Sequence, residues 1–178
     1  MILTGPEIQA AVHDGRVRID PYDRDLINPN SYNVRLGDTL HVYTEPVIDA
    51  YRHNPTQTQR IDSTGFVLQP GELYLGHTQE QVGSDVFVPL LFGRSSVGRL
   101  GLFVEITAPI GDVGFHGQWT LMLSPIRPLR VYPGMRIGQV MFFVCVGPID
   151  LYRGKYQASI GPQASRLWRD RQPVEVLS

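Results

Sequence analysis

Short apolar runs alternate with turn-forming residues along most of the sequence. Glycine, at 18 positions, and proline, at 14 positions, separate runs that are rich in β-branched and aromatic residues. Strands need only a few residues each, and Gly and Pro favour turns, so the pattern predicts many short strands in a sandwich or barrel. The expected fold class is mainly β. The runs expected to form strands are residues 34–36, 40–43, 66–68, 73–76, 86–92, 100–106, 119–123 and 140–146.

Residues 1–16 carry a different pattern, which predicts a short N-terminal helix. Thr4 and Glu7 have the spacing of a capping box, and Gly15 is placed to end the helix. The apolar stripe that would pack over one end of a sheet consists of Ile8, Ala11 and Val12. No chemistry is expected from this helix.

Two later stretches depart from simple alternation. Residues 51–60 are mostly polar, which favours an exposed loop or an excursion at a sheet edge. Residues 140–146 are apolar on both faces of the expected strand. An isolated two-layer sandwich buries such a strand poorly, whereas an interface between subunits would cover its second face.

Length and charge restrict the class of protein. A chain of 178 residues fits a single domain, residues 1–178, with its own core. The formal net charge of −1 and the absence of a long basic run indicate no nucleic-acid partner. No apolar run reaches the length of a membrane span, and the first residues lack the pattern of a signal peptide. We therefore expect no membrane partner and a cytoplasmic location.

The cysteine and histidine content argues against a protein-bound metal. Cys145 is the single cysteine, which excludes an internal disulfide and suits a reducing compartment. Zinc-dependent nucleobase deaminases need paired cysteines together with a His-x-Glu motif. The histidines are instead scattered, at positions 13, 41, 53, 77 and 116. Any deamination of a base by this chain would have to proceed without zinc.

A cluster of arginines and serines follows one of the expected strands. Arg94, Ser95, Ser96 and Arg99 come directly after Gly93. Guanidinium groups, hydroxyls and backbone amides can bind phosphate oxygens through charge-assisted hydrogen bonds. The alternative is a strand-to-helix turn in which Ser95 caps the helix and the arginines are solvated. The spacing alone leaves both interpretations open.

The order and spacing of several segments closely resemble the dCTP deaminase and dUTPase superfamily, and within it the deaminase branch. The resemblance rests on residues 27–37, 93–117, 133–139, 154–157 and 165–166. It implies a distorted jelly roll (a dUTPase-like β-clip) and a homotrimer whose active sites are shared between neighbouring subunits. It also implies that a nucleotide's phosphates are held by Arg94, Ser95, Ser96 and Arg99.

Residues 107–117 resemble the hairpin that recognises base and sugar in this superfamily, beginning at Thr107 and Ala108. Phe115 would pack on the deoxyribose and exclude a 2′-hydroxyl. Asp112 stands where the superfamily has an aspartate that lies beside the sugar 3′-hydroxyl or orients the water that attacks a phosphate. A core role for Phe115 and a turn role for Asp112 remain alternatives. Gly111 replaces the isoleucine common in the family.

The last part of the chain resembles the segment that closes over bound nucleotide, here residues 154–178. Within it Tyr156, Gln157 and Arg166 match substrate-contacting positions. Gln139 matches a glutamine near the phosphates. Closing segments of this kind exclude water and complete a site.

Met122 is the main departure from the resemblance. Deaminases of this type carry a glutamate here, which moves protons between water, the ring nitrogen and the leaving ammonia. A thioether transfers no protons. Glu105 lies in the apolar run 102–106, at a position where similar deaminases often have histidine. A carboxyl group in such surroundings can replace the missing acid and base, although strand alternation can equally direct it to solvent or to a partner arginine.

Three hypotheses for function follow. The sequence favours an enzyme that hydrolyses the phosphate chain of a pyrimidine deoxynucleotide rather than deaminating it, with Mg²⁺ bound through the phosphates and Asp112 acting on the water. The second is a dCTP deaminase that uses Glu105 as a displaced acid and base. The third is a catalytically inactive nucleotide-binding regulator.

Overall fold

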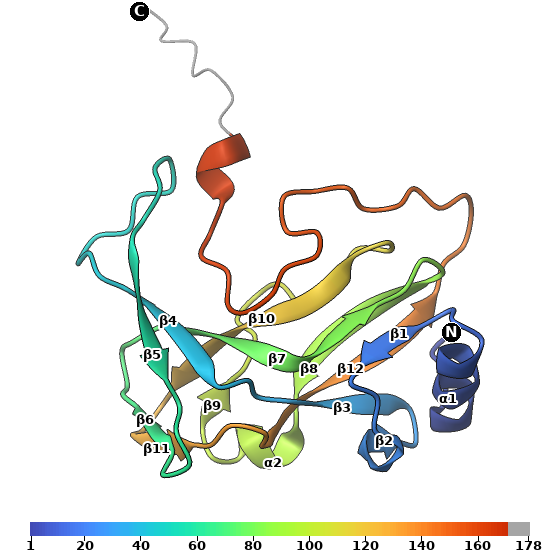
Figure 1. Cartoon of the computed structure of the whole chain (residues 1–178), viewed down its shortest axis with the longest axis horizontal. Helices are drawn as coiled ribbons and strands as arrows, with labels where there is room; N and C mark the ends of the chain where they lie inside the picture. The colour runs from blue at the N-terminus through green and yellow to red at the C-terminus, as the bar shows by residue number, and fades with distance from the viewer. Residues whose placement is uncertain (171–178) are drawn as a thin grey trace, which may run out of the picture.

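The computed structural model describes residues 1–170, which form two main antiparallel sheets and a small third one (Figure 1). The larger sheet has the strand order β5-β4-β7-β10-β9, with β1 pairing to β7, and the second sheet has the order β2-β3-β12-β8. A two-stranded sheet joins β11 and β6. Helix α1 lies at one end of the molecule, and the hairpin of β4 and β5 lies at the other end (Figure 1). The mainly β prediction is confirmed.

The helices and strands follow one another as α1 (Gly5–His13), β1 (Arg18–Asp20), η1 (Arg24–Leu26), β2 (Ile27–Asn28), β3 (Ser31–Arg35), β4 (Thr39–Tyr43), β5 (Thr56–Arg60), β6 (Phe66–Leu68), β7 (Tyr74–Gly83), β8 (Phe87–Gly93), α2 (Ser95–Gly98), β9 (Leu102–Phe103), β10 (His116–Pro125), β11 (Leu129–Val131), β12 (Arg136–Val144) and η2 (Leu167–Asp170). No helix within residues 1–170 is long and apolar enough to cross a membrane.

Strands β7 and β10 are the longest pair and form the centre of the larger sheet. Buried and half-buried residues alternate strictly along β10, and Leu121 and Leu123 on its buried face have no exposed surface. On the opposite face, Met122 lies across from Leu75 of β7. One face of β10 therefore packs into the core, and its other face forms part of a separate surface.

One expected element is confirmed in part and another is shorter than expected. Residues 51–60 are expected to form an exposed loop or an excursion at a sheet edge, and Thr56–Arg60 is the edge strand β5, paired antiparallel to β4. An edge strand needs little apolar content, since backbone hydrogen bonds to one neighbour can hold it. The expected strand over residues 100–106 is reduced to Leu102–Phe103. Gly101 precedes it with φ +80°, and the chain leaves the regular ladder after Phe103.

The N-terminal helix forms, but without the expected capping box. Thr4 occupies the N-cap in an extended conformation, and its side chain makes no capping hydrogen bond. The carboxylate of Glu7 instead accepts a hydrogen bond from Arg16 Nη2 at 2.9 Å. Gly15 follows the helix with φ +74°, the left-handed conformation in which glycine ends helices.

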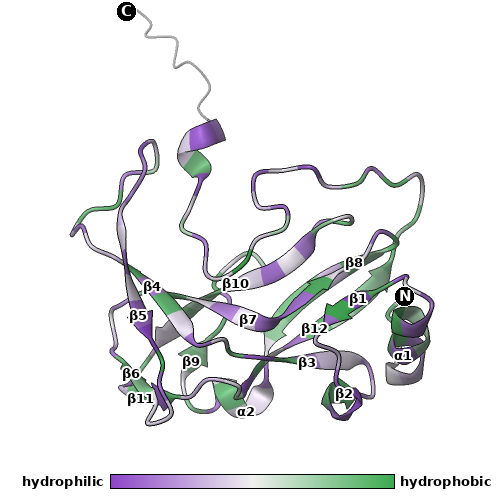
Figure 2. Ribbon diagram, in the orientation of Figure 1, coloured by the Kyte–Doolittle hydropathy of each residue, from purple (hydrophilic) through white to green (hydrophobic). Residues whose placement is uncertain are grey.

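The outward face of the four-stranded sheet is apolar. Val88, Leu90 and Phe92 of β8 lie half-buried opposite Phe143, Met141 and Gln139 of β12, respectively. The residues between them on both strands are largely buried in the core. Hydrophobic colouring follows β8 and the neighbouring part of β12 in Figure 2. This is the two-faced apolar strand that the sequence predicts within residues 140–146.

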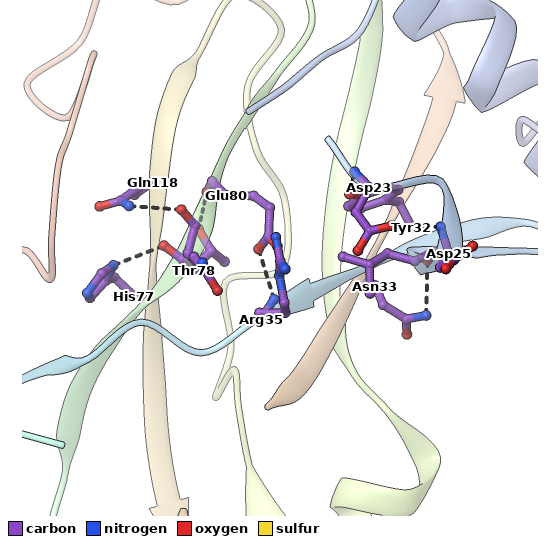
Figure 3. A network of polar contacts seen from close by, with 11 residues as sticks. Asp23, Asp25, Tyr32, Asn33, Arg35, His77, Thr78, Glu80 and Gln118 are labelled. Atoms are coloured by element: carbon purple, nitrogen blue, oxygen red, sulfur yellow. Dashed lines mark hydrogen bonds and ion pairs between the residues drawn. The ribbon is translucent and has the colours of Figure 1, made fainter. Parts of the chain in front are cut away.

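A buried ion pair joins the two main sheets (Figure 3). Glu80 of β7 has no exposed surface, and its carboxylate accepts hydrogen bonds from Arg35 Nε at 2.6 Å and the Arg35 backbone N–H at 2.8 Å. Arg35 ends β3 of the other sheet. The pair raises the pKa of the Arg35 guanidinium, chiefly through its hydrogen bond to Glu80. The ion pair therefore holds the two sheets together at this point, in addition to the packing of side chains.

Replacing Arg35 with Met should destabilise the fold by about 3–5 kcal/mol, because it leaves the Glu80 carboxylate buried without its counter-charge. Urea denaturation would measure the change. The matched control is Arg60→Met, which removes a guanidinium that is 71% exposed beside Asp38 and should cost about 0–1 kcal/mol. Equal losses for the two variants would contradict a special role for the buried pair.

Candidate active site

A pocket of about 470 Å³ opens on the face of the larger sheet where β4, β7 and β10 lie side by side. The loop before β10 and the C-terminal segment form its other walls. Its volume suits a small organic molecule, and most of its surface is apolar. The lining residues are Tyr43, Leu73, Leu75, Ala108, Ile110, Gly111, Asp112, Phe115, Gln118, Trp119, Thr120, Met122, Tyr152, Tyr156, Ser159, Gln163 and Ser165.

The structure brings several predicted site residues together in this pocket. Ala108, Asp112 and Phe115 reach it from the glycine-rich loop, and Tyr156 reaches it from the C-terminal segment. Met122, at the position of the expected glutamate, lies in the same wall. Asp112 is exposed, and it is the one charged side chain among the described residues of the lining.

An aromatic cluster forms one wall of the pocket. The ring of Phe115 packs edge-on against Trp119 at 5.9 Å and against Tyr152 at 6.0 Å between centroids. Trp119 is fixed by hydrogen bonds from its backbone N–H to Thr78 Oγ1 (2.9 Å) and from Nε1 to the Val82 carbonyl (3.1 Å). Phe115 therefore contacts aromatic neighbours and also faces the pocket. The sequence did not single out Trp119 or Tyr152, because aromatic residues in strands and loops usually belong to the core.

Gly111 explains how the loop reaches Trp119. A Cβ at this position would lie 2.2 Å from Trp119 Cη2 and 2.5 Å from Cζ2, well inside any tolerable contact. Because Gly111 has no side chain, its backbone can lie against the indole ring, where its N–H donates to the Pro89 carbonyl at 2.8 Å. The Trp119 ring thus occupies the space that an isoleucine side chain at position 111 would need.

The predicted phosphate-binding residues lie outside the pocket. The alternative of a strand-to-helix turn between β8 and α2 is confirmed, but Arg94 rather than Ser95 is the N-cap of this one-turn helix. Ser95, Ser96 and Arg99 are exposed. The Arg94 side chain donates to the Arg136 carbonyl at 3.4 Å. Within one chain, the arginine and serine cluster therefore belongs to the end of the four-stranded sheet.

Gln139 belongs to the same end of that sheet as Arg94. Its neighbour Gly138 pairs with Gly93, directly before Arg94. The Gln139 side chain accepts a hydrogen bond from Ser31 Oγ at 3.2 Å. The predicted site residues thus form two groups in a single chain, a pocket group and a group around Arg94 and Gln139.

The remaining predicted residues have mixed positions. Thr107 is exposed beside Ala108 and does not line the pocket. The Gln157 side chain is bound to backbone groups, accepting from His116 N at 2.9 Å and donating to the Gly114 carbonyl at 2.6 Å. Arg166 lies over the Tyr156 ring at 5.5 Å and donates to Gln163 Oε1 at 2.6 Å. Of the predicted closing segment, residues 171–178 lie outside the described residues.

Glu105 lies directly after the residue that pairs with Met122. The Val104 carbonyl accepts the Met122 N–H at 3.0 Å, so the Glu105 backbone lies beside the strand that carries Met122. The Glu105 side chain does not line the pocket. Its Oε1 atom is buried and has no hydrogen-bond partner among the described residues.

Comparison with known proteins identifies the family. The family model described as "DCD: dCTP deaminase-like" matches residues 2–145. The chain belongs to this family. It is 50% identical over 171 residues to a protein of Leptospira biflexa named "dCTP deaminase, dUMP-forming", covering 96% of this chain and 98% of the relative. Proteins with the same name in Cytophaga hutchinsonii and Clostridium beijerinckii are 46% and 44% identical, with the same coverage of 96% and 98%.

A solved structure confirms the jelly-roll fold expected from the resemblance. The crystal structure of 2′-deoxycytidine 5′-triphosphate deaminase from Agrobacterium tumefaciens aligns with a TM-score of 0.65 at 22% identity. The alignment covers 81% of this chain and 48% of that chain, so this family member spans about half the length of the solved protein. At this identity the likeness establishes the fold alone.

The comparisons correct the favoured hypothesis for function. Because Met122 replaces the expected glutamate, the sequence alone favours hydrolysis of the phosphate chain over deamination. Relatives that are 44–50% identical over nearly the whole chain are named as deaminases. One substitution in the pocket wall was given too much weight against similarity along the entire chain, and that hypothesis is withdrawn.

Gly111→Ala should destabilise this family member by about 1–3 kcal/mol, because the added methyl group forces the loop away from the Trp119 ring. Thermal or urea denaturation would measure the change. Gly98→Ala is the matched control, since a Cβ there meets nothing within 4 Å and α2 favours alanine. The proposed contact is refuted if Gly111→Ala is as stable as the control.

Proposed function

We propose that this protein deaminates dCTP, replacing the amino group at C4 of the cytosine with oxygen and releasing ammonia. The observation that carries the proposal is the 50% identity to a dUMP-forming dCTP deaminase over 96% of the chain. Formation of dUMP from dCTP changes the phosphate chain as well as the base. The proposed overall reaction therefore uses one water at C4 and a second water that releases the two outer phosphates.

Glu105 is proposed as the acid and base of the deamination. Its ionised carboxylate takes a proton from water as the oxygen adds to C4, and the protons then pass to N3 and to the amino group, which leaves as ammonia. Support comes from the position of Glu105 beside the strand of Met122 and from its buried Oε1 atom, which has no partner among residues 1–170. The Glu105 side chain does not line the pocket of the single chain, so the mechanism requires C4 of the base to extend beyond that lining and meet the carboxylate. Met122 itself offers no proton transfer.

The pocket is proposed to hold the deoxyribose and the base. Phe115 packs against the sugar and leaves no room for a 2′-hydroxyl, while the Asp112 carboxylate, which lines the pocket, binds the 3′-hydroxyl or orients the second water. The backbone of the loop from Thr107 and Ala108 onwards reads the pyrimidine edge. Tyr156, Gln157 and Arg166 belong to the segment that covers the bound nucleotide.

A homotrimer is proposed because neither group of residues forms a complete site within one chain. Among residues 1–170, no cationic side chain lines the pocket, and Arg94 and Arg99 lie outside it. The apolar outer face of β8 and β12 offers a surface that a second copy would cover. In the trimer, the phosphates of a nucleotide in one subunit's pocket would meet Arg94, Ser95, Ser96, Arg99 and Gln139 of the neighbouring subunit.

Mg²⁺ is proposed to enter with the phosphates of the nucleotide. Residues 1–170 contain no group of three or more His, Cys, Asp or Glu side chains that could hold a metal ion. A metal carried by phosphate oxygens needs few protein ligands, and Asp112 is the carboxylate available in the pocket. When bound, the ion would neutralise phosphate charge. A cytoplasmic location is proposed to accompany this role in nucleotide metabolism.

The Met122 position favours a second candidate, a nucleotide-binding regulator without turnover. With Met122 in the wall, Asp112 is the one carboxylate lining the pocket among the described residues. Such a protein would bind dCTP and release neither ammonia nor phosphate. The experiments below separate the two.

Incubation with dCTP and Mg²⁺ should release ammonia, and Glu105→Gln should lower the rate by about 10²–10⁴-fold, because an amide cannot take up the proton. Ammonia and pyrophosphate are measured separately. Glu7→Gln is the control, since Glu7 is an exposed glutamate of α1, a helix that contributes no residue to the pocket lining. Unchanged ammonia release in Glu105→Gln would remove Glu105 from the mechanism, and tight dCTP binding with no product would favour the regulator.

Arg94→Ala and Asp112→Ala should each be inactive alone, yet mixed trimers of the two should recover part of the activity. In a shared site, one subunit of the mixture supplies the intact arginine and its neighbour supplies the intact aspartate. The rate of dUMP formation from dCTP by the refolded mixture is compared with the rate for each variant refolded alone. If mixing restores nothing while the oligomer size is normal, the residues do not complete one another's sites.

A further inference from the structure

The C-terminal segment over residues 159–166, called the strap here, forms one wall of the pocket. Its residues Ser159, Gln163 and Ser165 belong to the lining. In Figure 1 the chain returns from β12 and passes beside β10 before it reaches η2. Hydrogen bonds to neighbouring strands hold the strap in place.

Three backbone N–H groups of the strap donate to side chains that line the other walls of the pocket. These bonds join Gly161 N to Gln118 Oε1 (2.6 Å), Gln163 N to Thr120 Oγ1 (3.0 Å) and Ser165 N to the Tyr43 hydroxyl (2.9 Å). Alternate residues of the strap thus meet alternate residues of β10 and then β4. Side-chain oxygens take the place that backbone carbonyls have in an ordinary β ladder.

The start of the strap is fixed differently. The Gln118 N–H donates to the Ser159 carbonyl at 2.8 Å, and the Ala158 N–H donates to the His116 carbonyl at 3.0 Å. These backbone bonds resemble true strand pairing. Ala158 has φ +57°, so the chain turns in a left-handed conformation just before the strap begins. From there on, the attachment to β10 and β4 depends on the three side-chain oxygens.

An attachment of this kind can open without disturbing the sheet. A single hydrogen bond of this type changes an equilibrium constant by about two- to tenfold. Breaking the three bonds would free the strap while β10 keeps its pairing to β7. The far end of the strap leads to Arg166, whose backbone N–H donates to the Tyr156 hydroxyl at 2.8 Å. Movement of the strap would therefore alter the covering wall of the pocket.

We propose that Gln118, Thr120 and Tyr43 are positioning residues that hold the strap closed over the pocket and so set the affinity for the nucleotide. They act through the strap backbone, because the side-chain oxygen of each residue accepts a hydrogen bond from a strap N–H group. The strap and its three bonds stand independently of the reaction. The expected change in KM rests on the proposed function.

Hydrogen exchange in the nucleotide-free protein tests the attachment directly. Thr120→Val keeps the shape of the side chain and removes the acceptor, so exchange in a peptide that spans residues 159–166 should speed up by about two- to tenfold. Thr120→Ser keeps an oxygen and should restore slow exchange. Thr58→Val, on the exposed edge strand β5, is the control and should match the original protein.

Kinetics and calorimetry test the consequence for the nucleotide. Thr120→Val and Tyr43→Phe should each raise the KM or the Kd for dCTP by about two- to tenfold and leave kcat within about twofold. A strap that opens more often lowers the fraction of protein molecules that are in the closed state able to bind dCTP. Tyr132→Phe removes an exposed hydroxyl outside the pocket and should change nothing. Calorimetry keeps the test valid if the protein binds dCTP without turnover.

The proposal is overturned if Thr120→Val and Tyr43→Phe fold normally and both exchange residues 159–166 at the original rate. It is also overturned if exchange rises but the Kd for dCTP is unchanged, since the strap would then play no part in binding. Loss of kcat alone, with KM unchanged, would assign Thr120 to the chemistry instead. If the protein releases no ammonia while the variants show faster exchange in residues 159–166 and a higher Kd for dCTP, the proposed function is refuted and the strap proposal stands.

Discussion

The antiparallel pairing of β7 with β10 is the constraint on which both the core and the pocket depend. The register places Leu121 and Leu123 in the core and leaves Thr120 and Met122 on the opposite face, where they line the pocket. Because side chains alternate between faces, a slip of one residue would exchange the two sets. The register also shifts between Gln118 and Thr120. This local irregularity allows Trp119 to contribute to the core and the pocket wall at once.

The two-group arrangement of the site follows from the same architecture. The pocket lies on the larger sheet, whereas Arg94 and Gln139 lie at one end of the smaller sheet, across the core that the buried Glu80 and Arg35 pair helps to fix. Within one chain, Arg94 and Gln139 do not line the pocket. In the proposed homotrimer, Arg94 and Gln139 of one copy would complete the pocket of its neighbour.

Several features could be read from the sequence because they depend on local pattern. The Gly and Pro punctuation predicted a mainly β fold, and Gly15 ended a helix near the expected place. The loop of Asp112 and Phe115 was expected to contribute to a pocket, and both residues line the pocket on the larger sheet. The sequence left residues 51–60 open between a loop and a sheet edge, because backbone hydrogen bonds hold a polar edge strand such as β5 and leave no hydrophobic pattern.

By itself the sequence determined the fold class and supplied candidate residues for nucleotide binding, since these follow from side-chain chemistry and short-range spacing. Only the tertiary structure decided which of them share a surface. It placed Met122 in the pocket wall, left a Glu105 oxygen buried without a partner and set Thr120 beneath the strap. Those positions arise from pairing between strands far apart in the chain, and long-range register is not encoded in any local pattern.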